Sequence, residues 1–246
     1  MDKVINLGIP HVGELIFERF DTPEVIQYSL VSKTWKVLAE NVLLKMWRGR
    51  MLDACKSGET RVVELLLERC KEESGLKNKD QRGCTVLMIA CEEGHKDVVQ
   101  LLLNYSEDPS IELNAKGQMG MTALMWACSK RHTDIVQLLL NYSGSNTELN
   151  ARNNRRETAF IWACACGGKD VVKLFLKHSG QNIELNLKDN IGFTGFMHAC
   201  RNGHKDVVQL LFENSEHNIE VNARDNDGKS AFMWACISGQ KDIGPF

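Results

Sequence analysis

The chain has 246 residues, of which 43% are hydrophobic, and this is enough apolar material to build a core. Its 30 basic and 32 acidic side chains give a formal net charge of -2, which excludes a strongly basic nucleic-acid-binding protein and a polyacidic tail protein. The start of the chain has no apolar run of signal-peptide length, and no stretch approaches the roughly 20 apolar residues that span a bilayer. We therefore expect a soluble protein in the cytoplasm, with the nucleus as a second location.

Residues 7–47 form a segment rich in large apolar side chains that does not share the pattern of the rest of the chain. Pro10 precedes one helical run. Thr22-Pro23-Glu24 begins a second, with an N-cap, a proline at the first helical position and an acid in the first turn. The segment predicts three short helices. So small a unit buries only about 60% of its surface or less, and we expect the apolar remainder to need a partner.

Several short motifs in this segment match a known family pattern. They read Ile9-Pro10, Glu14-Leu15-Ile16-Phe17, Phe20, Val25-Ile26, Leu30-Val31-Ser32-Lys33-Thr34-Trp35-Lys36-Val37-Leu38-Ala39 and Met46-Trp47. In this order they resemble the F-box, with Ser32 in place of the usual Cys and Ile9 in place of Leu. F-box proteins are receptors in cullin-based ubiquitin ligases, in which the box docks on a small adaptor bound to the cullin.

The F-box resemblance implies a set of residues for the interface with the cullin adaptor and for the core beneath it. These are Pro10, Leu15, Ile16, Phe17, Val25, Ile26, Leu30, Val31 and Trp35. The alternative is that they only form a helical cap on the domain that follows, because terminal repeats need capping.

From residue 51 onward the sequence repeats with a period of 36 or 37 residues. Six of the nine cysteines mark the period, each directly after an alanine: Cys55, Cys91, Cys128, Cys164, Cys200 and Cys236. Val98, Val99, Leu102 and Leu103 show one apolar helical stripe, and such a stripe recurs in later units. Each unit predicts two short helices followed by a polar turn. Neither helix can bury its stripe alone, so successive pairs must stack into a solenoid.

The unit resembles the ankyrin repeat. The resemblance is carried by Gly83 to Cys91, by Gly94-His95 and by Leu113-Asn114-Ala115, together with their later counterparts. Together the two resemblances imply an all-α protein, with a three-helix F-box at residues 1–47 and a solenoid of about six units at 48–246. The expected units cover residues 48–82, 83–119, 120–155, 156–191, 192–227 and, incomplete, 228–246.

The periodic cysteines favour a structural role. Equivalent positions in stacked helices lie roughly 8–10 Å apart, whereas a disulfide needs Cα atoms within about 7 Å. We expect these thiols at the small buried position where the family has Ala. A rival interpretation is the zinc-like spacing at Cys91/His95, Cys128/His132 and Cys200/His204. Each unit supplies only two ligands, so we expect no metal and no cofactor. Of the off-period cysteines, Cys166 is the candidate for exposure.

The position before each Ala-Cys pair predicts a binding surface. It holds Ile89, Trp126, Trp162, His198 and Trp234 in successive units, a ladder of residues one repeat apart. Trp is frequent at binding hot spots, although these rings could equally pack on one another within the stack. The turn tips add Met119, Met121, Ile191 and Phe193, which we expect to be exposed. The candidate substrate-binding residues are Trp126, Trp162, His198, Trp234, Met121, Arg155 and Phe193.

The chain shows no phosphate-binding loop, nucleophile elbow or paired-acid signature. We therefore expect a non-catalytic receptor subunit of an SCF-type ubiquitin ligase, which binds the cullin adaptor through the F-box and a protein substrate through the repeats. No nucleic-acid or membrane partner is expected. The alternative is an ankyrin interaction scaffold, or a competitive inhibitor, without a role in ubiquitin transfer.

Overall fold

The computed structural model describes residues 46–69, 79–105, 113–142, 148–178, 183–214 and 219–243. Within these ranges the regular elements are helices, and isolated β-bridges join Lys79 to Thr85 and Arg224 to Ser230. The predicted all-α fold is therefore confirmed. No described helix is long and apolar enough to cross a membrane. The predicted F-box helices fall almost entirely outside the described residues.

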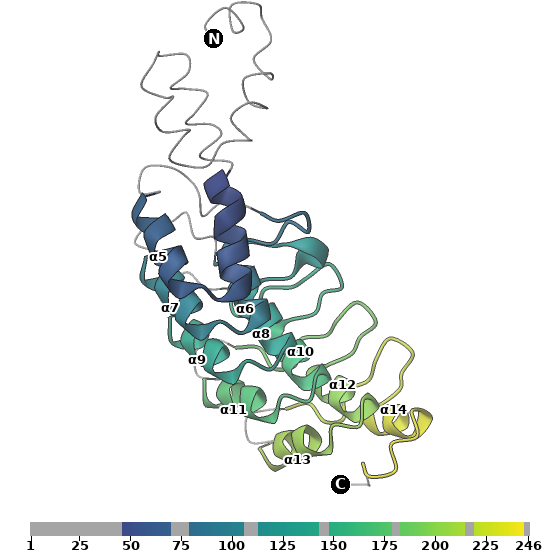
Figure 1. Ribbon diagram of the computed structural model, residues 1–246. Helices are drawn as coiled ribbons and strands as arrows, with labels where there is room; N and C mark the ends of the chain where they lie inside the picture. The colour runs from purple at the N-terminus through teal and green to yellow at the C-terminus, as the bar shows by residue number, and fades with distance from the viewer. Residues whose placement is uncertain are drawn as a thin grey trace, which may run out of the picture.

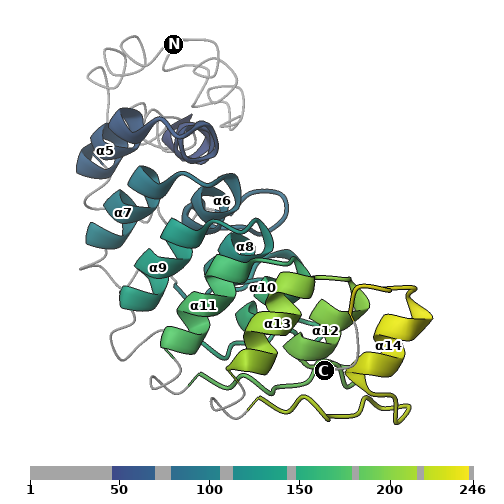
Figure 2. The same ribbon diagram turned by 90° about the horizontal axis from the view of Figure 1, so that it is seen from below.

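The helices form two rows that run side by side along the stack (Figures 1 and 2). The α6 row contains α6 (Val86–Glu93), α8 (Ala123–Ser129), α10 (Ala159–Ala165), α12 (Gly195–Arg201) and α14 (Ala231–Ile237). The α7 row contains α5 (Thr60–Arg69), α7 (Lys96–Asn104), α9 (Thr133–Asn141), α11 (Lys169–Lys177) and α13 (Lys205–Glu213). A helix over residues 46–57 leads into the first unit, and a 3₁₀ turn, η2 (Gln118–Gly120), precedes α8.

Each helix of the α6 row begins at a hydroxyl side chain. Thr85, Thr122, Thr158, Thr194 and Ser230 are the N-caps, and each accepts a hydrogen bond from the backbone N–H three residues later. Helices of seven to nine residues are too short to be stable alone in water. They persist here because their apolar faces meet in one continuous core that extends from the first unit to α14.

Histidine side chains form hydrogen bonds between neighbouring units. His95 donates from Nε2 to the carbonyl of Lys56 at 2.9 Å, and His204 donates in the same way to Ala165 at 2.8 Å. Each ring lies against a left-handed glycine of the preceding unit, Gly58 or Gly167, where an added Cβ would come within 2.5 or 2.6 Å of the ring. This contact explains why both the histidine and the glycine recur. It also means that His95 and His204, which belong to the Cys-x-x-x-His pairs, take part in the packing between units.

The periodic cysteines occupy the predicted small buried position in all units but the last. Cys55, Cys91, Cys128 and Cys164 are fully buried and Cys200 is 2% exposed, and the described cysteines are all free thiols. Burial raises the pKa of Cys55 and of Cys200 to about 12. The prediction is wrong for Cys236, which is exposed because the part of the chain described after α14 does not cover that face of the helix.

The burial pattern predicts the reactivity of the thiols. Iodoacetamide should modify Cys236 and the half-buried Cys166 in the native protein, whereas Cys91, Cys128 and Cys164 should react only after unfolding. Peptide mapping by mass spectrometry after a short exposure, with and without urea, measures this difference. Native labelling of Cys128 as rapid as that of Cys236 would contradict the stacked arrangement.

Candidate protein-binding surface

The ladder residues lie at the fourth position of their helices. Trp126, Trp162, His198 and Trp234 are each partly buried, whereas Ile89 is only 4% exposed. The three tryptophans also pack against the continuous core. The structure therefore gives each ring both a packing role and an exposed edge, and the contacts of each ring decide what it can bind.

Trp234 is held by a carboxylate nine residues earlier in the chain. Its Nε1 donates to Oδ2 of Asp225 at 2.7 Å, while Oδ1 of Asp225 accepts from the backbone N–H groups of Asp227 and Lys229. Burial alone would raise the pKa of Asp225, but these hydrogen bonds outweigh it and lower the pKa below its usual value. The ionised carboxylate therefore fixes both the turn and the indole.

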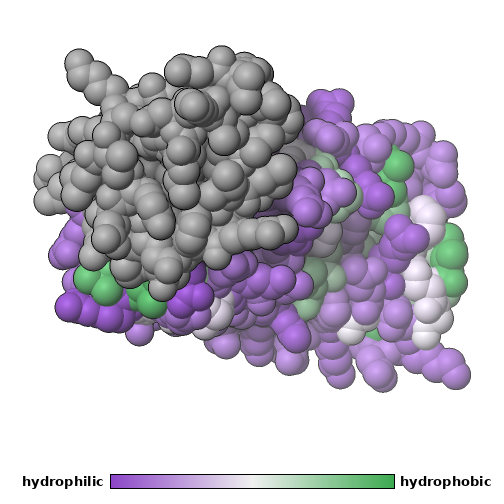
Figure 3. Space-filling model, turned by 45° about the horizontal axis from the view of Figure 1, so that its top comes forward, coloured by the Kyte–Doolittle hydropathy of each residue, from purple (hydrophilic) through white to green (hydrophobic). Residues whose placement is uncertain are grey.

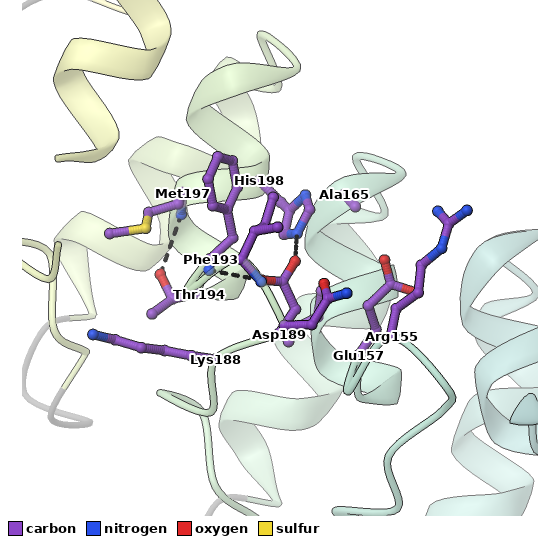
Figure 4. A network of polar contacts seen from close by, with 12 residues as sticks. Arg155, Glu157, Ala165, Lys188, Asp189, Phe193, Thr194, Met197 and His198 are labelled. Carbon is purple, nitrogen blue, oxygen red and sulfur yellow. Dashed lines mark hydrogen bonds and ion pairs between the residues drawn. The ribbon is translucent and has the colours of Figure 1, made fainter. Parts of the chain in front are cut away.

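His198 repeats this arrangement one unit earlier (Figure 4). Its Nε2 lies 2.9 Å from Oδ2 of Asp189, and Oδ1 of Asp189 accepts from the N–H groups of Ile191 and Phe193. Burial again acts to raise the pKa of Asp189, and the hydrogen bonds from His198 and the turn lower it overall. His198 is consequently engaged within the fold and presents only part of its ring to a partner.

The other two tryptophans have no such acceptor. Nine residues before Trp126 the chain has Gly117, which has no side chain. Nine residues before Trp162 it has Asn153, whose Oδ1 accepts from two backbone N–H groups and whose Nδ2 donates to Glu157. The Nε1 atoms of both tryptophans are buried without a hydrogen-bond partner. The ladder is thus chemically uneven, although it is regular in the sequence.

Cations cover two of the three indoles. The Arg82 guanidinium lies 5.7 Å from the ring centroid of Trp126 and is itself held by Glu92 at 2.8 Å. Arg201 and Lys229 lie 5.2 and 5.0 Å from the centroid of Trp234. Among the described residues, no cation stacks on Trp162. Its ring is therefore the one indole of the ladder that is not covered by a cation.

The turn tips correct one part of the prediction. Met119 and Ile191 are exposed, at 47% and 46%, but Met121 and Phe193 are each only 1% exposed. The prediction that these last two are exposed is wrong. Each follows a left-handed glycine that turns the chain back into the core, and Phe193 packs at 5.1 Å from both the His198 and the Trp234 rings. Met121 and Phe193 therefore support the surface from below.

One cluster could in principle hold a metal ion. Glu157, Asp189 and His198 each offer a ligand atom, and these atoms lie within 4.8 Å of one another. The groups are already hydrogen-bonded within the protein, Glu157 to Asn153 and Asp189 to His198. The next unit has the same geometry with Trp234 in the place of histidine, and an indole does not bind metals. The repeated bond therefore favours a bracing role for the cluster over metal binding.

The fold and this surface define a class: stacked helical repeats that present an exposed, chemically varied face. Ankyrin-repeat models match residues 51–116, 109–189, 145–220 and 181–245, and the chain belongs to the ankyrin-repeat family. The F-box domain model matches residues 10–47. Neither is typically a catalytic domain. The predicted adaptor-binding residues, from Pro10 to Trp35, lie in this second region and outside the described part of the chain.

Curated relatives match short stretches of the chain. The mouse Ankyrin repeat domain-containing protein 63 is 48% identical over 50 residues, and the human protein of the same name is 49% identical over 49. These matches cover 20% of this chain and 12% of each relative. Osteoclast-stimulating factor 1 of Monopterus albus is 43% identical over 63 residues, or 26% of this chain and 27% of that protein. The chain therefore covers about a quarter or less of the length of each of these relatives.

Proposed function

We propose that this protein is a substrate-recognition subunit of an SCF-type cullin ubiquitin ligase. The observation that carries the proposal is the order of the two domains, an F-box at residues 10–47 followed directly by ankyrin repeats from residue 51. The F-box would bind the cullin adaptor and the repeats would bind a protein substrate. The chain would contribute proximity and orientation, and other subunits would catalyse ubiquitin transfer.

The junction between the two domains supports this division of roles. A helix over residues 46–57 spans the end of the F-box match and the start of the first repeat, and Met51, Ala54 and Cys55 of this helix are buried in the repeat core. A continuous helix transmits orientation better than a Gly/Ser-rich tether does. In this arrangement Trp126, Trp162, His198, Trp234 and Arg155 remain the candidate substrate contacts. The role also implies a cytoplasmic or nuclear location.

Capture of the cullin adaptor tests the proposal. The tagged full chain should co-purify with the adaptor, and Trp35→Ala or Pro10→Ala should reduce the recovered adaptor at least tenfold, since truncation of a hot-spot residue costs about 2 kcal/mol or more. Lys56→Ala, at an exposed site in the first repeat, is the matched control and should keep the adaptor. Thermal unfolding of the repeats should be unchanged in all three variants.

Two results would contradict the ligase role: wild-type protein that captures no adaptor, or variants that retain it at the wild-type level. Either result would favour the second candidate, an ankyrin scaffold or competitive inhibitor that uses the same repeats without ubiquitin transfer.

A further inference from the structure

The fourth helix pair, α10 and α11, has a surface that departs from the repeat pattern. We define the α10 surface by Lys130, Arg131, Arg155, Trp162 and Cys166. Lys130 and Arg131 follow α8, which packs against α10, and Arg155 precedes α10 in the chain. Trp162 and Cys166 lie on α10 and at its C-terminal end. A helix of seven residues is about 10 Å long, so cations stand at both ends of a short, partly apolar strip.

Arg131 stands where the other units have glycine. The equivalent residues are Gly58, Gly94, Gly167, Gly203 and Gly239, and all of them have a positive φ. Arg131 keeps the left-handed conformation, with φ 62°, which is costly for a residue with a side chain. Residues held in such a conformation are frequent at functional sites.

A second departure accommodates the first. The next unit has Gly168 where His95, His132 and His204 stand in other units. A Cβ placed on Gly168 would lie 3.4 Å from Cγ of Arg131, so the arginine takes the space that a histidine ring fills elsewhere. This junction therefore lacks the histidine that hydrogen-bonds the preceding unit elsewhere, as His204 does to Ala165. The two departures together, arginine for glycine and glycine for histidine, place a guanidinium group on the surface instead.

Two of the three cations of this surface, Arg131 and Arg155, have no ion-pair partner among the described residues. Lys130 lies 3.8 Å from Glu92, but that carboxylate is bound more closely by Arg82. In Figure 4 the Arg155 side chain extends away from the Asp189 carboxylate. Arg82 and Lys229, by contrast, have carboxylate partners at 3.0 Å or less.

Between the cations lies the uncovered indole of the ladder. Trp162 is flanked on its helix by the small residues Ala165 and Cys166, both half-buried, and the exposed Met119 lies at the preceding tip. The described face that is visible in Figure 3 is mostly hydrophilic, with a few separate apolar patches. An apolar centre with an arginine that lacks an ion-pair partner among the described residues at each end is complementary to a negatively charged segment with an apolar anchor.

We propose that the α10 surface binds an extended acidic segment of a partner protein, with one bulky apolar side chain seated on Trp162. This deepens the proposed function, because under that function the acidic segment belongs to the substrate. Nucleic acid is also polyanionic, but the chain's net charge of -2 and its one local patch favour a short peptide.

A peptide library tests the proposal on the purified full chain. Nine-residue peptides with Leu, Phe, Trp or Gly fixed at the centre, and acidic, neutral polar or basic residues at the flanking positions, are selected on immobilised protein. Acidic residues should be enriched on both sides of a bulky apolar centre. Binding of the best peptide should weaken as salt rises from 50 to 500 mM, since exposed charges are screened over a Debye length.

Substitutions separate this surface from the rest of the chain. Arg131→Gly combined with Gly168→His restores the pattern of the other units while removing one cation, so the stack should not be weakened. Addition of Arg155→Gln removes a second cation. Each lost arginine should weaken binding of the best peptide two- to fivefold, which is the range for exposed charge pairs. Lys96→Gln with Lys205→Gln removes the same charge from exposed sites on the α7 row and should leave binding unchanged.

Three outcomes would overturn the inference: no preference for acidic residues, affinity unchanged in the triple variant, or a mixed-sequence single-stranded oligonucleotide that binds more tightly than the best peptide. The assay needs no cullin adaptor. Acidic enrichment without adaptor capture would keep this inference and remove the ligase role, and the reverse result would do the opposite.

Discussion

Phe175→Ala should destabilise the solenoid by about 3–5 kcal/mol, the usual cost of truncating a fully buried phenylalanine. Phe175 is completely buried in α11, which packs between α9 and α13 in the middle of the stack. Its ring meets Phe160 of α10 edge to face, with centroids 5.6 Å apart. The substitution therefore leaves a cavity between the two helix rows. Urea unfolding followed by circular dichroism measures the loss.

Two further variants make this result specific. Phe212→Ala makes the same change in the next unit at a side chain that is 38% exposed, and it should cost about 1 kcal/mol. Phe175→Leu should cost less than about 1.5 kcal/mol, because the equivalent positions hold Leu102, Leu139 and Leu211 and the core accepts that shape. Equal losses for Phe175→Ala and Phe212→Ala would show that α11 is not packed as described.

The sequence was sufficient to predict the architecture because the same pattern is repeated several times. An apolar stripe such as Val98, Val99, Leu102 and Leu103 does not by itself determine how the helix packs. Because the stripe recurs every 36 or 37 residues, a stack of helix pairs is the arrangement that buries all the stripes. The buried face of each helix then follows from the period. The burial of Cys55 to Cys200 follows for the same reason, and Cys236 departs from it because α14 is not covered in the same way.

The individual contacts of the surface could not be predicted in this way. A common register makes Trp126, Trp162 and Trp234 look equivalent, yet their partners depend on a residue nine positions earlier, across the turn. That residue lies before the Gly83 to Cys91 block that carries the resemblance, and at the three tryptophans it is Gly117, Asn153 or Asp225. The exposure of the turn-tip residues could not be predicted for a related reason. A glycine with positive φ reverses the side-chain direction within two residues, so Met119 is exposed and Met121 is buried.

The same comparison predicts that one substitution has a large effect at one of two equivalent sites and a small effect at the other. Asp225→Asn should destabilise the α14 unit by about 1.5–3 kcal/mol, because an indole N–H can only donate and would face the amide of asparagine. The unit that has Asn153 at this position already has a tryptophan, Trp162, whose Nε1 has no hydrogen-bond partner. Asp189→Asn should cost less than about 1 kcal/mol, because His198 can shift its proton between ring nitrogens and accept from the new amide.

Hydrogen exchange at the amides of α12 and α14 measures the two effects locally, which suits a stack whose end unit can unfold separately.

Because hydrogen bonding lowers the pKa of Asp225 in the folded state, its stabilising contribution is complete above the unfolded value of about 3.9 and is lost as the pH falls through the folded value. The difference in amide protection between wild type and Asp225→Asn should therefore become smaller at acidic pH. Asp227→Asn, at an exposed carboxylate of the same turn, is the control and should change protection little. Equal losses of amide protection in Asp189→Asn and Asp225→Asn would mean that the ability of the ladder ring to accept a hydrogen bond does not decide how the ring is held.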